Sequence, residues 1–302
     1  MLRYGVVVHG GVGSPAAWND GCERAAEAAF RLLETGGHAL DAVQAAAVIL
    51  EDDGRYNAGS GSTLRLDGAT IEMDASLMDA EGRIGVVAAV RGIKNPIRAA
   101  REVMNTPHVI LSGDGAAAFA RSRGVAEPHP GPGPRAQERF ENVRRALGGR
   151  TFDGLAEAWR NFDLRAHWNF DVPYEKIFGH GDTIGAVALD REGRLAVANS
   201  TGGASPMLAG RIGDSPIVGS GFYAGPSAAV AGTGIGEEII RRMLAREVHD
   251  AIAHGEEVAA ACERAVARFP ESVPVGVIAV SRRGRAAVHN RDMAWASKGK
   301  EE

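Results

Sequence analysis

Cysteine, lysine and long apolar runs are all scarce in this 302-residue chain. Its two cysteines, Cys22 and Cys262, are too few for a disulfide framework or a cysteine-based zinc site. No apolar stretch has the length of a membrane span, and the apolar run near the N-terminus is too short for the core of a signal peptide. We therefore expect a protein of the reducing cytoplasm.

A strong excess of charge is also missing. The formal net charge of −4 gives no reason to expect nucleic acid or an anionic membrane as a partner. No cluster of histidine, cysteine and acidic residues has the spacing of metal ligands, so we expect no catalytic metal. With 45% hydrophobic and 24% charged residues, the composition is typical of a globular protein with a large core.

Strand-like and helical patterns alternate along the chain. Short apolar runs predict strands at 4–9, 63–66, 69–73, 84–90, 108–111, 183–189, 195–200, 228–231, 275–281 and 286–289. Helical periodicity predicts helices at 16–33, 39–49, 96–104 and 116–123, and long helical stretches between 231 and 269. Asp67 and Gly68 are expected to close a hairpin, and the strands at 275–281 and 286–289 to end the chain as a second hairpin. Asn95 is expected to cap the helix that begins at Pro96.

These elements predict an α/β fold. Two sheets with helices on their outer faces, a four-layer α/β/β/α sandwich, would bury each apolar face. Proline and glycine cluster at 127–134, which indicates a loop, and little strand pattern follows before Gly181. We expect a single domain, 1–302, in which 125–182 is a variable linker region.

Thr183 carries the strongest chemical signal, because it follows Gly181 and Asp182 and opens an apolar, strand-like run. A threonine hydroxyl in mid-chain is a poor nucleophile. If the chain is cut before Thr183, the new α-amine, which titrates at about pH 7.7–8.0, becomes a base on the same residue. Threonine paired with its own N-terminal amine is an activated nucleophile. A turn leading into an ordinary buried strand explains the same stretch when it is taken alone.

A guanidinium and a carboxylate lie three residues apart at Arg211 and Asp214, beside glycine and proline. Arginine binds a carboxylate through two parallel hydrogen bonds, and aspartate is a natural partner for an ammonium group. Together they could hold both ends of an α-amino acid. An exposed ion pair on a turn, which contributes little free energy, is the alternative.

Glycines surround Thr233 between a predicted strand and a predicted helix, in the stretch 232–236. Backbone amides in such a turn stabilise negative charge and could hold a phosphate or a tetrahedral oxyanion. The stretch lacks the lysine of a P-loop and the full dinucleotide-binding fingerprint, so a phosphate site is not expected. Glycines that only permit a tight turn are the alternative.

Seven short motifs follow one another in a characteristic order. They are His9-Gly10-Gly11-Val12-Gly13, Asn57-Ala58-Gly59-Ser60-Gly61, Met73-Asp74-Ala75-Ser76-Leu77-Met78-Asp79, Gly181-Asp182-Thr183-Ile184-Gly185-Ala186-Val187, Ser200-Thr201-Gly202-Gly203, Gly210-Arg211-Ile212-Gly213-Asp214-Ser215-Pro216 and Gly232-Thr233-Gly234. In this order they resemble the plant-type L-asparaginase/isoaspartyl peptidase family, whose members are N-terminal-nucleophile hydrolases related to glycosylasparaginases. The resemblance runs from about residue 5 to residue 290 and is weakest between 125 and 178.

The resemblance implies a role for each catalytic residue. It identifies Thr183 as the nucleophile, freed when the chain autoproteolyses its Asp182–Thr183 bond. Thr201 would hydrogen-bond to the nucleophile and orient it. The Thr233 hydroxyl and the Gly234 amide would form the oxyanion hole.

Substrate binding and maturation involve further positions. The resemblance implies that Arg211 binds the α-carboxylate of the substrate and Asp214 its α-ammonium group. Gly10 and Gly11 match a glycine loop associated with maturation. Asn57 matches a supporting residue on the α-chain side of the site.

Processing would leave an α chain of residues 1–182 and a β chain of residues 183–302. The family's habit is a homodimer of such αβ units. The family's loop before Asn57, here Leu50 to Tyr56, often binds a sodium ion through backbone oxygens. No other cofactor is implied.

The implied reaction is hydrolysis of the side-chain amide of L-asparagine and of the isopeptide bond of β-aspartyl dipeptides. A glycosylasparaginase is one alternative, and an uncleaved protein with a binding or structural role is another. The chain departs from the family pattern where Asn199 replaces a frequent threonine, Met207 a frequent lysine, and Arg291-Asp292-Met293 the usual Thr-x-x-Met. We expect these differences at the rim of the pocket, where they would affect the preferred leaving group.

Overall fold

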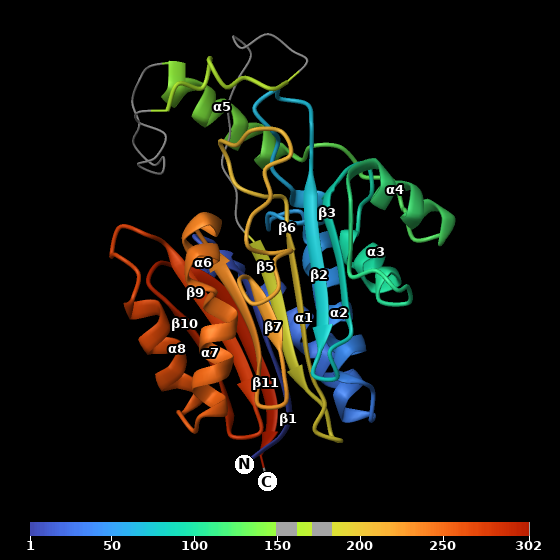
Figure 1. Ribbon diagram of the computed structural model, residues 1–302, viewed down its shortest axis with the longest axis vertical. Helices are drawn as coiled ribbons and strands as arrows, with labels where there is room; N and C mark the ends of the chain where they lie inside the picture. Colours follow the sequence, from blue (N-terminus) through green and yellow to red (C-terminus); the bar gives the residue numbers. More distant parts are fainter. Residues whose placement is uncertain (149–161, 171–182, 302) are drawn as a thin grey trace.

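Two β-sheets face each other in the computed structural model, which describes residues 1–148, 162–170 and 183–301 (Figure 1). The larger sheet has the strand order β11 (Met293–Glu301), β1 (Leu2–Val12), β5 (Thr183–Leu189), β6 (Leu195–Thr201), β2 (Met73–Asp79), β3 (Ile84–Val90) and β4 (Ile110–Ser112). The smaller sheet has the order β10 (Gly284–His289), β9 (Val275–Ser281), β8 (Ala229–Gly234) and β7 (Phe222–Ala224). Neighbouring strands are antiparallel except β3 and β4, which are parallel.

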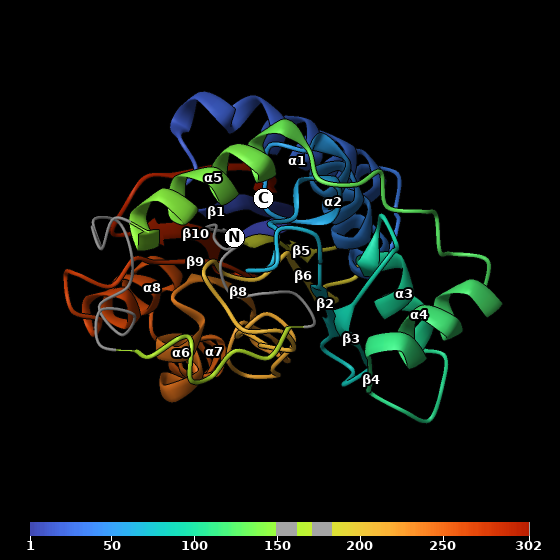
Figure 2. The same cartoon turned by 90° about the horizontal axis from the view of Figure 1, so that it is seen from above.

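Helices cover the outer faces of both sheets. The larger sheet packs against α1 (Asn19–Glu34), α2 (Ala39–Asp53), α3 (Pro96–Val103) and α4 (Gly113–Ser122). The smaller sheet packs against α7 (Leu244–Ala253) and α8 (Val258–Ala267), and α6 (Gly236–Arg242) follows directly from β8. Figure 2 shows the two groups of helices on opposite sides of the sheets. Helix α5 (Pro134–Gly148) lies beyond the end of the sheets at which β5 begins (Figure 1).

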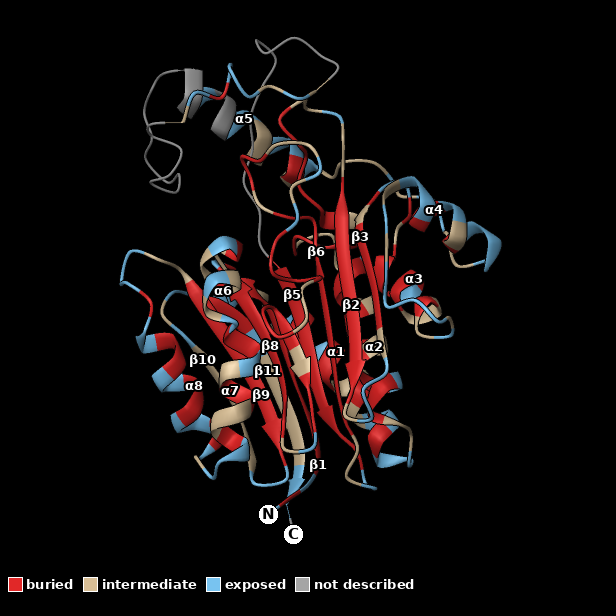
Figure 3. Cartoon of the chain, viewed as in Figure 1, coloured by how far each residue is buried: buried red, intermediate tan, exposed pale blue. Residues whose placement is uncertain are grey.

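Most strand residues of both sheets are buried (Figure 3), because side chains on both faces of a sheet are covered. On β1, Val6 and Val8 belong to the core under α1 and α2, whereas Val7 belongs to the core between the two sheets. Successive side chains of a strand point to opposite faces, so a strand buried on both sides reads as a continuous apolar run. A third core lies between the smaller sheet and its helices.

Most of the predicted elements are confirmed. Strand β5 has the predicted bounds, and the helices predicted at 16–33 and 39–49 correspond to α1, with a short 3₁₀ turn before it, and to α2. The loop predicted at 127–134 contains no helix or strand before α5 begins at its last residue. Within the described part of the chain, none of the helices combines the length and the apolar character that a membrane span requires.

The hairpin predicted around Asp67 and Gly68 is wrong. Asp67 does make a turn, in which its carboxylate accepts hydrogen bonds from the amides of Ala69 and Thr70. The flanking residues form no strands, however, and the next strand, β2, begins only at Met73. That strand pairs with β3 and with β6, and its side chains are buried on both faces of the sheet.

One further prediction fails at the end of the chain, which does not close with the β9–β10 hairpin, since β11 returns to the larger sheet and pairs with β1. Asn95 is the N-cap residue of α3 and Pro96 is its first residue, as predicted. The Asn95 side chain makes no capping hydrogen bond, and its amide donates to Glu51 and Asp52. The sequence patterns did not predict strand β7, which is only three residues long.

Candidate active site

Strand pairing brings the first two predicted catalytic residues together. Thr183 is the first residue of β5 and lies directly opposite Thr201, the last residue of β6. The Thr183 hydroxyl donates to Thr201 Oγ1 at 3.2 Å, and both side chains are buried. Asp182, on the other side of the predicted cleavage point, lies outside the described residues.

Asn57 supports Thr201 through the two glycines that follow it. The Asn57 side chain donates from Nδ2 to the carbonyl of Gly203 at 2.7 Å. The backbone carbonyl of Asn57 accepts from the amide of Gly202 at 2.9 Å. The Gly203 amide in turn donates to Thr201 Oγ1 at 2.9 Å. Because Asn57 Oδ1 also accepts from the amide of Thr63, the side chain holds the end of β6 in place.

Thr233 lies at the end of the smaller sheet that is near Thr183. The amide of Val12, at the end of β1, donates to Thr233 Oγ1 at 3.2 Å. Strand β1 runs antiparallel to β5, so Val12 and Thr183 are at the same end of the larger sheet. Gly234 has a φ of +146°, and a Cβ there would lie 2.4 Å from the carbonyl oxygen of Pro274, so this turn requires glycine.

Gly10 and Gly11, which were expected in a loop, lie instead near the end of β1, where its pairing with β11 shifts register. Gly10 lies against the ring of Tyr56, where a Cβ would come within 2.3 Å of a ring carbon. The amide of Gly11 donates to His9 Nδ1 at 3.1 Å, and its carbonyl accepts from the Ser14 hydroxyl at 2.5 Å. These two glycines directly precede Val12, the last residue of β1, whose amide donates to Thr233.

Arg211 and Asp214 approach each other around Gly236. The ideal Cβ position of Gly236 is 2.7 Å from Arg211 Nη2 and 3.0 Å from Asp214 Oδ1. The two residues are not an exposed pair on a turn, since Asp214 is only 3% exposed. Arg211 instead pairs with Glu237, which accepts from its Nε atom at 2.9 Å and from its Nη2 atom at 2.8 Å.

The electrostatics of this cluster suit an α-amino acid. Burial raises the pKa of Asp214 to about 7, although the nearby Arg211 guanidinium lowers it. Its Oδ2 atom has no hydrogen-bond partner among the described residues, so it is free to accept a bond from an ammonium group. Burial opposes the charge of Arg211, but the pair with Glu237 outweighs it and raises the pKa. A bound cation next to Asp214 would favour the ionised carboxylate.

A buried ion pair that the sequence reading missed holds both ends of the loop from Gly202 to Gly210. Arg65 donates through Nη1 to the carbonyl of Gly202 at 2.8 Å and through Nε to Glu72 at 3.0 Å. Glu72 also accepts from the amide of Gly210 at 2.8 Å. An arginine between two leucines, within a stretch predicted to be a strand, was the signal that could have revealed a paired internal charge.

Glu237 was also missed as the partner of Arg211. The sequence places it at the end of the glycine turn, with no periodic relation to residue 211. Only the fold brings the start of α6 next to the chain between β6 and β7, since the two positions are 26 residues apart in sequence.

The positions that depart from the family pattern differ in exposure. Asn199 is 0% exposed, Met207 2% and Met293 3%, whereas Arg291 and Asp292 are exposed. Strand pairing explains the result for Asn199, which faces Gly185 inside the larger sheet.

The predicted sodium loop is shorter than expected. Helix α2 continues to Asp53, and Gly54 then leaves it in a left-handed conformation, so only the last residues of the stretch from Leu50 to Tyr56 are irregular. In the portion of the chain that is described, no group of three or more histidine, cysteine and acidic side chains could hold a metal ion. That finding does not concern backbone carbonyl ligands.

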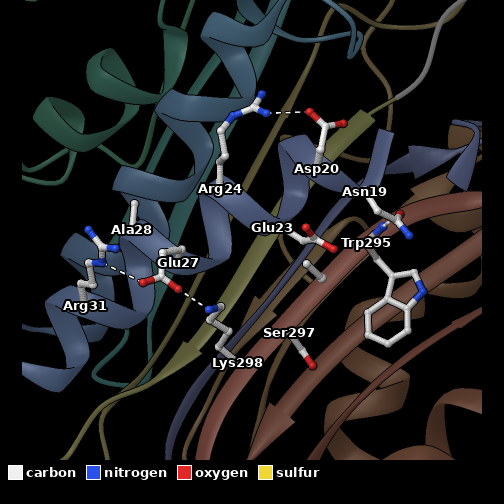
Figure 4. Close-up of a pocket in the computed structure, with 11 residues that line it drawn as sticks. Asn19, Asp20, Glu23, Arg24, Glu27, Ala28, Arg31, Trp295, Ser297 and Lys298 are labelled. Carbon is white, nitrogen blue, oxygen red and sulfur yellow. Dashed lines mark hydrogen bonds and ion pairs between the residues drawn. The ribbon is translucent and has the colours of Figure 1, made fainter. Parts of the chain in front are cut away.

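A separate open groove lies at the edge of the larger sheet (Figure 4). Helix α1 and strand β11 form its walls, with Asp20, Arg24 and Glu27 on α1 and Trp295 and Lys298 on β11. None of the predicted site residues lines this groove. We therefore take the site around Thr183, Thr201 and Thr233, and not the groove, as the candidate active site.

Comparisons with known proteins agree with the order of the motifs. The sequence profile of a family described as asparaginase matches residues 4–302. The chain is 39% identical over 305 residues to a plant-type L-asparaginase of Pyrobaculum calidifontis, covering 96% of this chain and 95% of that protein. It is 39% identical over 310 residues to the isoaspartyl peptidase/L-asparaginase of Homo sapiens, covering 97% and 92%. A plant-type L-asparaginase of Pyrococcus furiosus is 35% identical over 304 residues, covering 96% and 95%.

Proposed function

The chain belongs to the asparaginase family, and we propose that it is an autoprocessing threonine hydrolase whose nucleophile is Thr183. Its substrates are the side-chain amide of L-asparagine and the isopeptide bond of β-aspartyl dipeptides, in line with the names of its relatives. The observation that carries the proposal is the 3.2 Å hydrogen bond between Thr183 and Thr201. The Thr183 hydroxyl is therefore already hydrogen-bonded to Thr201 before a substrate binds.

The mechanism begins at the N-terminal amine that cleavage creates. The amine of Thr183 takes the proton of its own hydroxyl as the oxygen attacks the side-chain carbonyl of the substrate. The Thr233 hydroxyl and the Gly234 amide stabilise the oxyanion. The amine returns the proton to the leaving ammonia or amine, which leaves a β-aspartyl ester on Thr183. Water then hydrolyses the ester and releases aspartate.

Arg211 and Asp214 select the substrate. A bidentate guanidinium holds the α-carboxylate, and the buried carboxylate holds the α-ammonium group. Because both ends of an amino acid must be free, asparagine residues inside a protein chain are excluded. Burial of Asp214 excludes water from this contact and so strengthens it.

Processing of the bond before Thr183 is part of the proposal. Cleavage yields an α chain of residues 1–182 and a β chain of residues 183–302, with 125–182 as the variable segment. The two facing sheets with outer helices correspond in this proposal to the α/β/β/α sandwich of N-terminal-nucleophile hydrolases. We further propose a homodimer of αβ units in the cytoplasm, and a sodium ion on backbone oxygens near Leu50 to Tyr56.

Intact-mass measurement of the purified protein tests the nucleophile. We expect the 31.6 kDa chain to disappear during incubation and two fragments divided at Thr183 to replace it. Thr183→Ala removes the attacking oxygen, so that variant should remain intact and inactive. A wild-type chain that persists as one species would refute the proposal and favour an uncleaved binding or structural protein.

Substrate assays on the cleaved protein separate the remaining possibilities. We expect aspartate to be released from L-asparagine and from β-aspartyl dipeptides. Preference for an aspartyl-glucosamine substrate over both would identify a glycosylasparaginase instead.

A further inference from the structure

A row of polar residues crosses the larger sheet directly beneath Thr183. Backbone pairing aligns His9 with Gly185 and Gly185 with Asn199, on strands β1, β5 and β6. Side chains at every second position share a face, so this row faces the smaller sheet, as Thr183 does. The next row down is apolar and includes Val187. The row therefore separates the catalytic hydroxyls from the core between the sheets.

Asn199 connects the two sheets through its amide. Its Nδ2 atom donates to the carbonyl of Gly221 at 3.0 Å and to that of Gly232 at 3.3 Å. Because both partners are acceptors, the nitrogen must lie on that side, and Oδ1 faces back toward Gly185. Gly232 directly precedes Thr233. Asn199 thus joins the strand of Thr201 to the strand of the proposed oxyanion hole.

His9 presents the complementary group on the other side of Gly185. Its Nδ1 atom accepts from the amide of Gly11, so the hydrogen of the neutral ring is on Nε2. Burial lowers the pKa of His9 to about 3, which keeps the ring neutral. His9 Nε2 and Asn199 Oδ1 have no hydrogen-bond partners in the described ranges. They lie 2.5 and 2.8 Å from the point where a Cβ of Gly185 would stand.

We propose that Asn199 is a positioning residue of the active site, and that His9, on the other side of Gly185, lines the same buried gap. A buried donor and a buried acceptor face the one position in the row that has no side chain, and they complement each other there. The Asn199 amide sets the distance between the nucleophile's sheet and Thr233.

Thr233 is consequently held from two sides. The amide of Val12, at the end of β1, donates to the Thr233 hydroxyl, and Asn199 donates to the carbonyl of Gly232, the residue before Thr233. Both contacts originate in the larger sheet, although Thr233 belongs to the smaller one. The position of the oxyanion-stabilising groups relative to Thr183 therefore depends on these bridges between the sheets.

The inference rests on the proposed function and predicts a specific kinetic effect. Misplacing a catalytic group by about 1 Å can lower a rate about 100-fold. Thr233 and Gly234 act on the tetrahedral intermediate, whereas Arg211 and Asp214 hold the substrate's amino-acid end. Loss of the Asn199 amide should therefore lower kcat about 100-fold and leave KM within about twofold.

Asn199→Ala, measured on fully cleaved protein with a β-aspartyl dipeptide, tests this effect. Asn199→Thr keeps a hydroxyl and part of the volume, so its kcat should fall between those of Asn199→Ala and the wild type. Val197→Ala is the matched control, because Val197 lies one row lower on the same strand and contributes apolar packing only. We expect this control to lower the Tm and to retain the wild-type kcat.

A wild-type kcat in Asn199→Ala, with a Tm lowered as in the control, would overturn the inference and leave Asn199 a structural residue. If the alanine variant does not fold, an unchanged kcat in Asn199→Thr has the same force. A cleaved wild-type protein that hydrolyses no aspartyl substrate refutes the proposed function instead. Crystal structures then decide the positioning claim, which requires a different separation of Thr183 and Thr233 in the variant.

Discussion

The two halves of the active site are held in place by different means. Thr183 and Thr201 occupy paired strands, where the register of the backbone hydrogen bonds sets their distance. Arg211 and Asp214 occupy irregular chain between β6 and β7, where an ion pair with Glu237 holds the Arg211 side chain. A backbone ladder responds little to pH or salt, whereas charged pairs respond to both. The nucleophile is thus built into the fold. The position and charge of Arg211 and Asp214, here called the substrate clamp, depend on their electrostatic surroundings.

The largest effect is expected where the clamp's support is buried. Glu72→Gln leaves the Arg65 guanidinium, 1% exposed, without its counter-charge and should lower the free energy of unfolding by about 3–5 kcal/mol. Denaturant unfolding in the uncleavable Thr183→Ala background measures this loss on an intact chain. Arg91→Met is the matched control, since Arg91 also pairs with Glu72 but is 52% exposed, and it should cost about 1 kcal/mol or less. Equal losses would show that burial does not distinguish the two pairs.

Asp214→Asn tests the clamp itself while keeping its shape. The amide cannot balance the substrate's ammonium charge, so kcat/KM should fall at least about 100-fold, in the range for one lost partner of a buried charge pair. Autocleavage, which involves Thr183 and Thr201 on the paired strands, should proceed to completion. Steady-state kinetics and intact mass together check this division. Loss of autocleavage in this variant would contradict the separation of the two halves.

The pH profile sharpens the comparison, because each half contributes one titrating group. Asp214, with a pKa of about 7, must be ionised, and the Thr183 amine, near pH 7.7–8.0, must be unprotonated. Both requirements fail as the pH falls, so log kcat/KM should drop below pH 7 with a slope approaching about 2. In Asp214→Asn the slope should approach about 1. The same slope in both proteins would show that Asp214 does not titrate in this range.

The smallest effect is expected at the exposed end of the clamp. Glu237→Gln weakens the pair that holds the Arg211 guanidinium, but Glu237 is 51% exposed. A contact of this kind contributes about 0.2–1 kcal/mol, so KM should rise no more than about fivefold. The value of kcat should not change. A large fall in kcat would instead place Glu237 in the chemical step.

Local patterns predicted much of the fold. Strand β5 and helix α2 were recognisable because an apolar run and a 3.6-residue period are properties of short stretches. Strand β11 was not, because Ser297, Lys298 and Lys300 interrupt its apolar pattern and its pairing with β1 joins the two ends of the chain. The turn at Asp67 was recognised, but no local signal showed that its flanks would stay irregular.

By itself, the sequence determined the family and its candidate catalytic residues, Thr183, Thr201 and Thr233, through residue types in a fixed order. The tertiary structure decided how these residues are supported. Arg65, Glu237 and Asn199 have partners that are distant in sequence, and a hydrogen bond or ion pair depends on distance in space. Composition and periodicity describe neighbours along the chain, so contacts between the two sheets and their loops emerge only when the chain folds.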